Sequence, residues 1–347
     1  MRRLVMARSR IWMSVVPRVS GRNEVYLLMV FLSLVAVLAT FSDKFLTLEN
    51  VFDILRNYSF LGILTLGELV VLISGGIDVS FMAVATVAQY VMGVAITIYP
   101  FAHITIAILL PMSIGAALGA LNAVLIYYTR VHPVIITIAT LNVFYGVLVF
   151  LTGGRWIYEL PNSFFAFAQR MPIRLMSKAG VPYGLSVLTL IWVFVAALTW
   201  FILNYLPIGR KIYALGGNPE AARRAGVNIF MVMLFVYAYM GLLSGLAGFV
   251  QAQLTQLIQP NSMVGRELDV LAAVVLGGAS VFGGSGSVTG AILGVLTVAI
   301  VRNGLILMKI SSYWHDVVIG LILAAAAATT AYQSKKHTRR GVRIYVQ

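Results

Sequence analysis

The segment Ser74-Gly75-Gly76-Ile77-Asp78-Val79-Ser80 joins two long apolar runs and holds an acidic side chain in apolar surroundings. Two glycines beside an aspartate predict a break between helices, which is tolerated at membrane depth only where the backbone lines a cavity or is buried in protein. An aspartate near the bilayer centre costs about 2.5–3.5 kcal/mol and needs polar partners. We therefore expect Gly75, Gly76, Asp78 and Ser80 to line a pathway or a gate. The simpler alternative is that Asp78 or Ser80 caps the following helix.

A second segment, Leu276 to Ser287, consists largely of glycine, alanine and serine and follows the acidic residues Glu267 and Asp269. A glycine-rich run can resemble a phosphate-binding loop, but the lysine of the pattern G-x-x-x-x-G-K-[ST] is missing, so a nucleotide site is not supported. The composition favours a hairpin of broken helices instead. Gate, hinge and plain close packing remain open as its role. The candidate glycines are Gly277, Gly278, Gly283 and Gly284.

A short polar helix is predicted at 216–226, between two long apolar segments. Asn218 can cap its start, Pro219 suits the first helical position, and Gly226 can close its end in the left-handed conformation. An acidic residue in the first turn and arginines in the last turn complement the helix dipole. A helix of about seven residues is marginal alone in water, because nucleation is costly. Docking against another protein would explain it, and a helical elbow between two spans is the alternative.

Further polar side chains lie within the long apolar segments. Glu68 and Arg302 are ionisable, and intramembrane ionisable residues are functional candidates by default. We expect Arg302 to pair with an acid or to lie near an interface. The uncharged residues Asn122, Thr137 and Asn142 are candidates for the pathway, because they could hydrogen-bond the hydroxyls of a solute. They could also simply bridge neighbouring helices, for about 1 kcal/mol or less each.

Composition identifies a membrane protein. Of the 347 residues, 60% are hydrophobic and only 10% are charged, with a mean hydropathy of +0.94, whereas a soluble domain carries about 25% charged residues. The chain contains no cysteine, which excludes disulfides and thiolate metal sites. The four histidines are far apart in the sequence, so we expect no metal site. An enzyme is not expected either, because the H-E-x-x-H and G-x-S-x-G motifs are missing.

The net charge of +14 is concentrated near the two ends of the chain. Basic flanks of membrane spans usually lie in the cytoplasm and contact anionic lipid heads. No pattern of alternating basic and aromatic residues suggests base stacking, so the expected partner of this charge is the lipid bilayer and not a nucleic acid. We expect a basic cytoplasmic segment at 1–24, a transmembrane domain at 25–333 and a basic cytoplasmic tail at 334–347.

A membrane span needs about 20 apolar residues. On that scale the chain is an all-α polytopic membrane protein with about ten transmembrane helices, some broken or re-entrant. Ten spans put both termini on the cytoplasmic side, together with the loop 206–228. The segment 152–182 then falls outside although it carries four basic residues, which runs against the positive-inside rule. The predicted spans are 25–42, 54–74, 80–99, 103–128, 133–151, 183–205, 229–257, 268–283, 287–308 and 314–333.

Pairs of glycines four residues apart predict close helix packing, because small residues let helix backbones approach where lipid supplies no hydrophobic drive. Generic packing of the bundle explains them without any functional role. The pairs are Gly115 with Gly119, Gly241 with Gly245, and Gly290 with Gly294.

Four motifs occur in order along the chain, each modest alone but specific as a set. They are Phe45-Leu46-Thr47 with Asn50; Gly75-Gly76-Ile77-Asp78-Val79-Ser80; Tyr213-Ala214-Leu215-Gly216-Gly217-Asn218 with Ala221-Ala222 and Ala225-Gly226-Val227; and Leu271-Ala272-Ala273-Val274-Val275-Leu276-Gly277-Gly278 with Gly283-Gly284-Ser285-Gly286. Through them the chain resembles, from about Phe45 to about Ala331, the permease subunits of bacterial ABC importers of the ribose, xylose, galactose and autoinducer-2 type.

The resemblance implies import of a monosaccharide or related small polar solute by alternating access. It implies two permeases, as a homodimer or heterodimer, two cytoplasmic ATPase subunits that bind ATP and Mg²⁺, and a periplasmic solute-binding protein. No cofactor is expected on this chain itself. In such permeases the loop matching 216–226 couples the spans to the ATPase. The predicted coupling residues are Gly217, Asn218, Pro219, Glu220, Ala221, Ala222, Arg223 and Gly226.

The competing class is an ion-coupled secondary transporter, which would also need ten or more spans and broken helices. The sparse buried acids and the docking-type loop argue against it. The solute stays open among polyols, pentoses, hexoses, 6-deoxyhexoses and autoinducer-2. Thr152-Gly153-Gly154-Arg155-Trp156-Ile157 with Leu160-Pro161, and Trp314 with Asp316, look most like permeases of the autoinducer-2 or rhamnose type. The basic N-terminal extension is longer than such subunits need.

Overall fold

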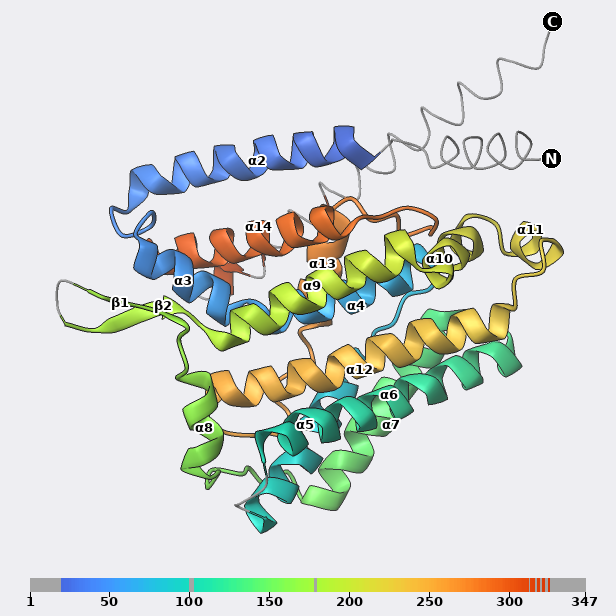
Figure 1. The fold of residues 1–347 in the computed structure, drawn as a ribbon, viewed down its shortest axis with the longest axis horizontal. Helices are drawn as coiled ribbons and strands as arrows, with labels where there is room; N and C mark the ends of the chain where they lie inside the picture. The colour runs from blue at the N-terminus through green and yellow to red at the C-terminus, as the bar shows by residue number, and fades with distance from the viewer. Residues whose placement is uncertain are drawn as a thin grey trace, which may run out of the picture.

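The computed structural model describes residues 20–99, 103–177 and 180–311, and beyond them 313–315, 317–318, 320–321 and 324. Most of the predicted basic segment 1–24, most of the predicted span 314–333 and the whole predicted tail 334–347 lie outside these residues. The long helices run along the longest axis of the molecule, with the short helix α11 (Pro219–Arg224) at one end and a two-stranded hairpin near the other (Figure 1). We refer to these as the α11 end and the hairpin end.

Seven helices of the described chain are long and apolar enough to cross a membrane. A further pair, α3 (Leu48–Asn57) and α4 (Ser59–Ile73), is bent by 50° and passes the same test as one broken span. These elements correspond to eight of the ten predicted segments. The seven helices are α2 (Ser20–Phe41), α5 (Phe81–Ile98), α6 (Ile104–Thr129), α7 (Pro133–Thr152), α9 (Val187–Tyr205), α12 (Ile229–Thr255) and α14 (Val288–Leu307).

The predicted span 268–283 is not a single membrane-crossing helix. Its helix, α13 (Glu267–Leu276), has ten residues, which reach about 15 Å at 1.5 Å per residue, half of a hydrocarbon core of about 30 Å. A loop rich in glycine follows and leads to α14. The short helix fits the broken-helix alternative for this region, and the count of about ten spans is not confirmed by the described residues.

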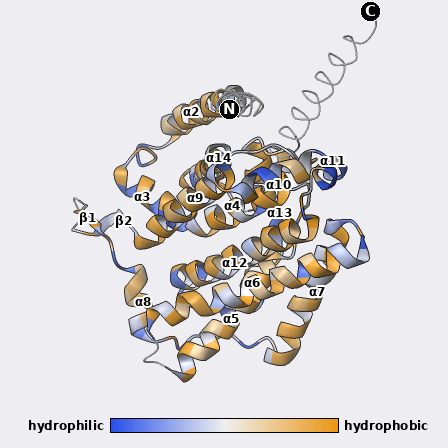
Figure 2. Cartoon of the chain, turned by 45° about the vertical axis from the view of Figure 1, so that its right-hand side comes forward, coloured by the Kyte–Doolittle hydropathy of each residue, from blue (hydrophilic) through white to orange (hydrophobic). Residues whose placement is uncertain are grey.

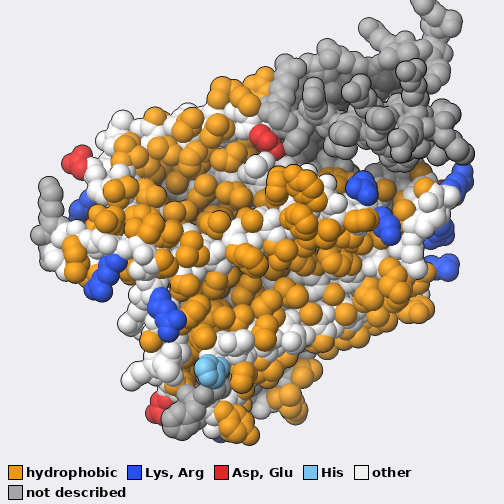
Figure 3. All heavy atoms as spheres, viewed as in Figure 1, with side chains coloured by type: hydrophobic (Ala, Val, Ile, Leu, Met, Phe, Trp, Pro, Cys, Tyr) orange, Lys and Arg blue, Asp and Glu red, His pale blue; other side chains and the backbone are white. Residues whose placement is uncertain are grey.

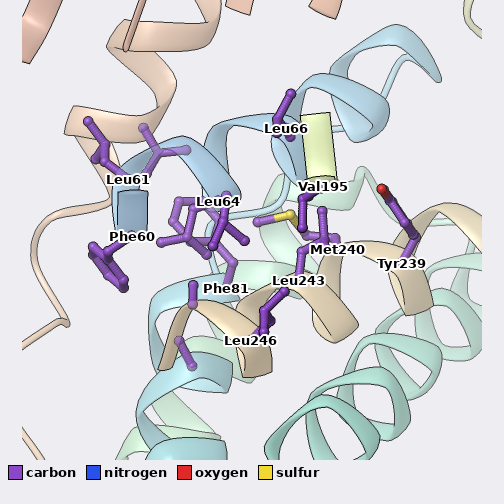
Figure 4. Packing of buried hydrophobic residues seen from close by; sticks show 14 of the residues in the cluster. Phe60, Leu61, Leu64, Leu66, Phe81, Val195, Tyr239, Met240, Leu243 and Leu246 are labelled. Carbon is purple, nitrogen blue, oxygen red and sulfur yellow. The ribbon is translucent and has the colours of Figure 1, made fainter. Parts of the chain in front are cut away.

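Helix α4 lies in the centre of the bundle. All fifteen of its residues are buried, as expected for a helix that is apolar on every side. It packs against α9, α12, α13 and α14. Figure 4 shows Leu64 of α4, Val195 of α9 and Leu243 of α12 within one buried cluster. The outer helices instead expose many apolar side chains. Figure 2 shows that apolar residues predominate along these helices, and Figure 3 shows apolar side chains over most of one face between the two ends.

The glycine pairs bring helix backbones into contact, as predicted. A Cβ atom on Gly115 would collide with the carbonyl oxygen of Gly241, and one on Gly241 with that of Gly115. Helices α6 and α12 therefore cross with no side chain between them. The same holds for α13 and α14, where a Cβ atom on Gly277 would come within 2.5 Å of the carbonyl oxygen of Gly290.

The described residues are consistent with the predicted all-α polytopic membrane protein, to which they add a small two-stranded hairpin between α7 and α9 that the sequence did not predict. This stretch contains the short helix α8 (Asn162–Ala168) and an antiparallel hairpin of β1 (Ile173–Met176) and β2 (Pro182–Leu185). Arg174 pairs with Gly184, where a Cβ atom would collide with the carbonyl oxygen of Ile173. The strands are only four residues long, too short for the alternation of apolar and polar residues to reveal them.

A second difference concerns the loop 206–228. Its first half forms a helix of its own, α10 (Pro207–Gly217), which the sequence reasoning missed. Pro207 occupies the first helical position, and Ile212 and Leu215 are buried against the bundle. Proline at this position followed by apolar residues three and four apart is a signal that would have found the helix.

Candidate functional site

Helix α11 forms as its residue types predict. The Asn218 side-chain oxygen accepts hydrogen bonds from the backbone N–H groups of Glu220 and Ala221, at 3.0 and 2.9 Å. Pro219 occupies the first helical position, where a backbone N–H has no partner within the helix, so its absence costs no hydrogen bond. Asn218 also ends α10, because its own N–H donates to the carbonyl of Ala214 at 3.1 Å. One asparagine thus terminates one helix and starts the next.

The far end of α11 closes through a left-handed glycine. Gly226 has a φ of +81°, and its N–H donates to the carbonyl of Arg223 at 3.0 Å. The N–H of Val227 reaches back to the carbonyl of Ala222 at 3.0 Å. This pair of bonds is the motif that commonly satisfies the last carbonyls of a helix. The predicted short helix is confirmed, with six residues instead of about seven.

Helix α11 presents almost all of its surface to solvent. Ala222 is its one buried residue, and the helix packs against α10 and α12. Glu220 and Arg224 form a salt bridge of 3.1 Å in which both side chains are more than 70% exposed. Such an exposed pair contributes little to stability. The helix is therefore an exposed, charged projection with a single apolar anchor.

Helix α10 joins α11 to the membrane bundle. The hydroxyl of Tyr213 donates a hydrogen bond to the carbonyl of Gly286 at 2.8 Å, which ties α10 to the loop between α13 and α14. Burial raises the pKa of the Tyr213 phenol to about 12, so the hydroxyl keeps its proton and remains a donor at neutral pH.

Four glycines from three distant segments meet beside α10. We call this contact, formed by Gly75, Gly216, Gly283 and Gly284, the glycine junction. A Cβ atom on Gly283 would lie 2.7 Å from the carbonyl oxygen of Gly216 and 2.8 Å from the Cα of Gly75. The N–H of Gly284 donates to the carbonyl of Ile73, the last residue of α4, at 2.9 Å. The end of α4, the end of α10 and the α13–α14 loop are thus in backbone contact.

The polar residues of the α4–α5 loop form a buried network. Asp78 accepts hydrogen bonds from the backbone N–H and the hydroxyl of Ser80, both at 2.7 Å. The Asn122 amide of α6 donates to the same hydroxyl at 2.7 Å, and Glu68 of α4 accepts from the N–H of Asp78 at 3.2 Å. We call Glu68, Asp78, Ser80 and Asn122 the polar cluster. All four are almost fully buried.

The sequence offered two roles for this loop, a pathway or gate and a cap on the following helix. Ser80 precedes α5 but its side chain does not cap the helix. The Asp78 carboxylate stabilises the loop by accepting hydrogen bonds from Ser80, two residues later. It also belongs to the polar cluster, to which α4 contributes Glu68 and α6 contributes Asn122. Tyr237 of α12 adds a buried hydroxyl beside Gly76, and no sequence signal had marked it. Gly75 and Gly76 serve different contacts, the first at the glycine junction and the second beside Tyr237.

Of the other predicted pathway residues, some lie beside the polar cluster and others lie apart from it. Thr137 is buried and donates to the carbonyl of Ile77 at 3.4 Å, which places it next to the polar cluster. Asn142 lies apart from it, exposed on α7, and donates to the carbonyl of Ile138 in its own helix at 2.8 Å. Gly277 and Gly278 end α13, and Gly278 adopts a φ of +84°.

The expected partner of Arg302 is an acid of the broken helix. Its guanidinium lies 2.7 Å from the carboxylate of Asp269 in the first turn of α13, and Arg266 approaches the same carboxylate at 3.6 Å. The pair links α13 to α14 away from the glycine junction. Within the described residues, no group of three or more His, Cys, Asp and Glu side chains is arranged to hold a metal ion.

Helix α10 and the glycine junction thus connect the exposed helix α11 to the interior of the helix bundle. A profile of the family described as "Branched-chain amino acid transport system / permease component" matches residues 50–327. No solved structure matches the chain.

Three curated relatives cover nearly the whole chain. The ribose import permease protein RbsC of Escherichia coli (strain K12) is 33% identical over 307 residues, 86% of this chain and 91% of the relative. The D-allose transport system permease protein AlsC of the same strain is 30% identical over 305 residues, 87% and 90% of the two chains. The autoinducer 2 import system permease protein LsrC of Photorhabdus laumondii is 28% identical over 310 residues, 88% and 89%.

The profile covers well over half of the chain, and the relatives cover 86% and 87% of it. Both matches include the α4–α5 loop, the α10–α11 segment and the α13–α14 loop that the geometry singles out. The chain is therefore a multi-pass membrane protein that belongs to this family of transport-system permease components.

Proposed function

We propose that the chain is the membrane-spanning permease subunit of an ATP-driven importer for a monosaccharide or a related small polar solute. The observation that carries the proposal is the 33% identity to a ribose import permease over 86% of the chain. The family description names branched-chain amino acids, but the relatives compared above carry the names of ribose, allose and autoinducer-2. All three are small solutes with several oxygen-bearing groups.

The partners follow from this assignment. Two permease chains, identical or different, form the translocation path in the inner membrane. Two ATPase subunits that bind ATP and Mg²⁺ lie beneath them in the cytoplasm, and a periplasmic protein delivers the solute. On this assignment the α11 end faces the cytoplasm and the hairpin end faces outward. The first turn of α2 lies toward the α11 end (Figure 1), which agrees with a cytoplasmic N-terminus.

Helix α11 is the proposed contact with the ATPase. Its capping makes it a preformed helix although it is far too short to be stable alone, and its charged side chains project freely. When ATP closes the ATPase dimer, α11 moves with it and drives the spans between inward-facing and outward-facing states. The proposed coupling residues are Gly217, Asn218, Pro219, Glu220, Ala221, Ala222, Arg223 and Gly226, with Arg224 beside them. Ala222 is buried and acts as the anchor of the helix, whereas the others are exposed.

The proposed pathway or gate lies where the α4–α5 loop and the α13–α14 loop meet the bundle. Broken helices near the middle of a membrane are typical of solute sites in transporters, because their free backbone groups can bind polar ligands. The proposed residues are Gly75, Gly76, Asp78, Ser80, Asn122, Thr137, Gly277, Gly278, Gly283 and Gly284. Asn142, the remaining predicted pathway residue, lies apart from this place, exposed on α7.

Site-directed crosslinking tests the ATPase contact directly, because the chain contains no cysteine of its own. The variant Arg224→Cys places a single thiol on exposed α11, and Ile173→Cys places one on the exposed strand β1 as the matched control. In intact cells, a thiol-reactive crosslinker should trap an ATPase subunit with Arg224→Cys and not with Ile173→Cys. Trapping by the control alone would overturn the assignment of the two ends.

Uptake into proteoliposomes separates the energy sources. An ATP-driven importer loses uptake with vanadate and keeps it when an ionophore abolishes ion gradients. The reverse pattern would contradict the proposed function and favour an ion-coupled transporter. The solute itself is best identified by thermal-shift screening of the cognate binding protein with pentoses, hexoses, 6-deoxyhexoses and autoinducer-2.

A further inference from the structure

Helix α11 has little contact with the bundle except through its neighbours. Its one buried side chain is that of Ala222, so any displacement of α11 reaches the spans mainly through α10 and the start of α12. Besides the packing of its buried residues Ile212 and Leu215, helix α10 is attached to the bundle at the glycine junction and by the bond from Tyr213 to Gly286. The junction contacts both the end of α4 and the α13–α14 loop, and the Tyr213 bond contacts the same loop.

The glycine junction differs from an ordinary side-chain contact. A Cβ atom on Gly216 would collide with the carbonyl oxygen of Ile73 and would lie 2.7 Å from the amide nitrogen of Gly284. The contact is therefore formed by main-chain atoms on every side. A side chain can change rotamer when its neighbour shifts, but a close-packed backbone has no such freedom and passes the displacement on. Movement of α10 must accordingly move the end of α4 and the α13–α14 loop.

The loop after α4 leads directly into the interior. Gly75 belongs to the glycine junction, and the next residue lies against the Tyr237 hydroxyl. Asp78 accepts a hydrogen bond from Ser80, whose hydroxyl accepts one from Asn122 of α6. The six residues from Gly75 to Ser80 thus connect the α10 contact to α6. Asp78, Ser80 and Asn122 are almost fully buried and bonded in series, so they respond together when the loop shifts.

We infer that Tyr213, Gly216 and Gly283 are positioning residues that couple the displacement of α11 to the α4–α5 loop and the α13–α14 loop. Through them α10 moves both loops at once. The inference rests on the proposed function, because it assigns the internal route by which ATP hydrolysis on a partner opens the path. Tyr213 and Gly216 fulfil this role without touching either the solute or the ATPase.

The test measures solute transported per ATP hydrolysed by the full complex of permease and ATPase in proteoliposomes. In Gly216→Ala the new methyl group must separate α10 from α4. We expect ATPase co-purification to persist while this ratio falls by about tenfold, within the range of typical coupling free energies. The matched control is Gly146→Ala, since a Cβ atom at this position of α7 meets no neighbour within 4 Å. It should keep the wild-type ratio.

A second variant keeps the inference testable if Gly216→Ala fails to accumulate in the membrane. Tyr213→Phe removes only the hydroxyl that bonds to Gly286. Loss of one neutral hydrogen bond of about 1 kcal/mol should lower the transport ratio about fivefold. Tyr99→Phe, on an exposed residue after α5, is its control and should have no effect.

The outcomes separate the inference from the proposed function. A wild-type ratio in both Gly216→Ala and Tyr213→Phe overturns the inference while the importer assignment stands. A parallel loss of ATP hydrolysis and uptake, with the ratio unchanged, also overturns it, because that result indicates a defect in ATPase docking. Wild-type protein that binds no ATPase and ignores vanadate overturns the proposed function itself, and the inference with it.

Discussion

The two ends of the molecule are held together in different ways. At the α11 end, three segments touch through main-chain atoms at the glycine junction. At the hairpin end, one pair of main-chain hydrogen bonds joins Ile157 to Ile258, at 3.0 and 3.1 Å. Side chains make further contacts there, such as the Gln253 amide that donates to the carbonyl of Phe164 at 2.9 Å and the Phe164 and Phe249 rings 5.8 Å apart. The strand β1 is exposed along its whole length. The close main-chain contact at the glycine junction is suited to transmitting the displacement of one segment to the next. The exposed hairpin is suited to changing its side-chain conformations when a partner binds.

The largest effect that this contrast predicts is at the anchor of α11. Ala222→Asp puts a carboxylate into the buried contact that holds α11 against the bundle, and an unpaired buried charge costs several kcal/mol. We expect uptake in proteoliposomes to be abolished while the membrane fold stays intact by circular dichroism. Ala166→Asp, on an exposed residue of α8, is the matched control and should transport normally. Normal uptake by Ala222→Asp with normal ATPase assembly would refute the coupling role.

An intermediate effect is expected at the hairpin end. Arg170 and Arg174 are exposed there, and charges at the rim of an interface chiefly change association rates and their salt dependence. If this end receives the binding protein, Arg170→Glu combined with Arg174→Glu should weaken the stimulation of ATP hydrolysis by loaded binding protein about tenfold at low salt. The basal ATPase rate should stay unchanged. Equal loss of basal and stimulated rates would show that the hairpin end also belongs to the moving machinery.

The smallest effect concerns the stability of the polar cluster. Asn122→Ala removes the amide that donates to Ser80, and interhelical hydrogen bonds in membranes contribute about 1 kcal/mol or less. The thermal midpoint of the purified protein should therefore fall by only a few degrees. Asn204→Ala is the control, because Asn204 is exposed and bonds only to the carbonyl of Trp200 within its own helix. An equal shift in both variants would mean that the cluster adds nothing to helix packing.

Local signals made α11 predictable. Asn218, Pro219 and Gly226 each act on residues next to them in the sequence, so their capping roles could be predicted before any fold was known. The long spans were predictable for the same reason, because apolar length is a local property. The clean span 268–283 failed as a prediction because glycines interrupt the apolar run after only ten helical residues.

Contacts between distant segments could not be predicted in this way. Gly75, Gly216 and Gly283 stood out as glycines, but nothing in a single sequence states that they touch each other. Tyr237 gave no signal at all, since a tyrosine in an apolar helix usually marks only packing. Asn142 and Asn122 were equivalent candidates by residue type, and only the fold separates the exposed one from the buried one.

The double role of Asn218 has a mechanical consequence. The same residue ends α10 through its backbone and starts α11 through its side chain, with no intervening linker. The two helices therefore move as one rigid, bent unit, so a force applied to α11 rotates α10 directly. Inserting even one residue between the two helices would add a flexible joint, and only part of the displacement of α11 would reach α10.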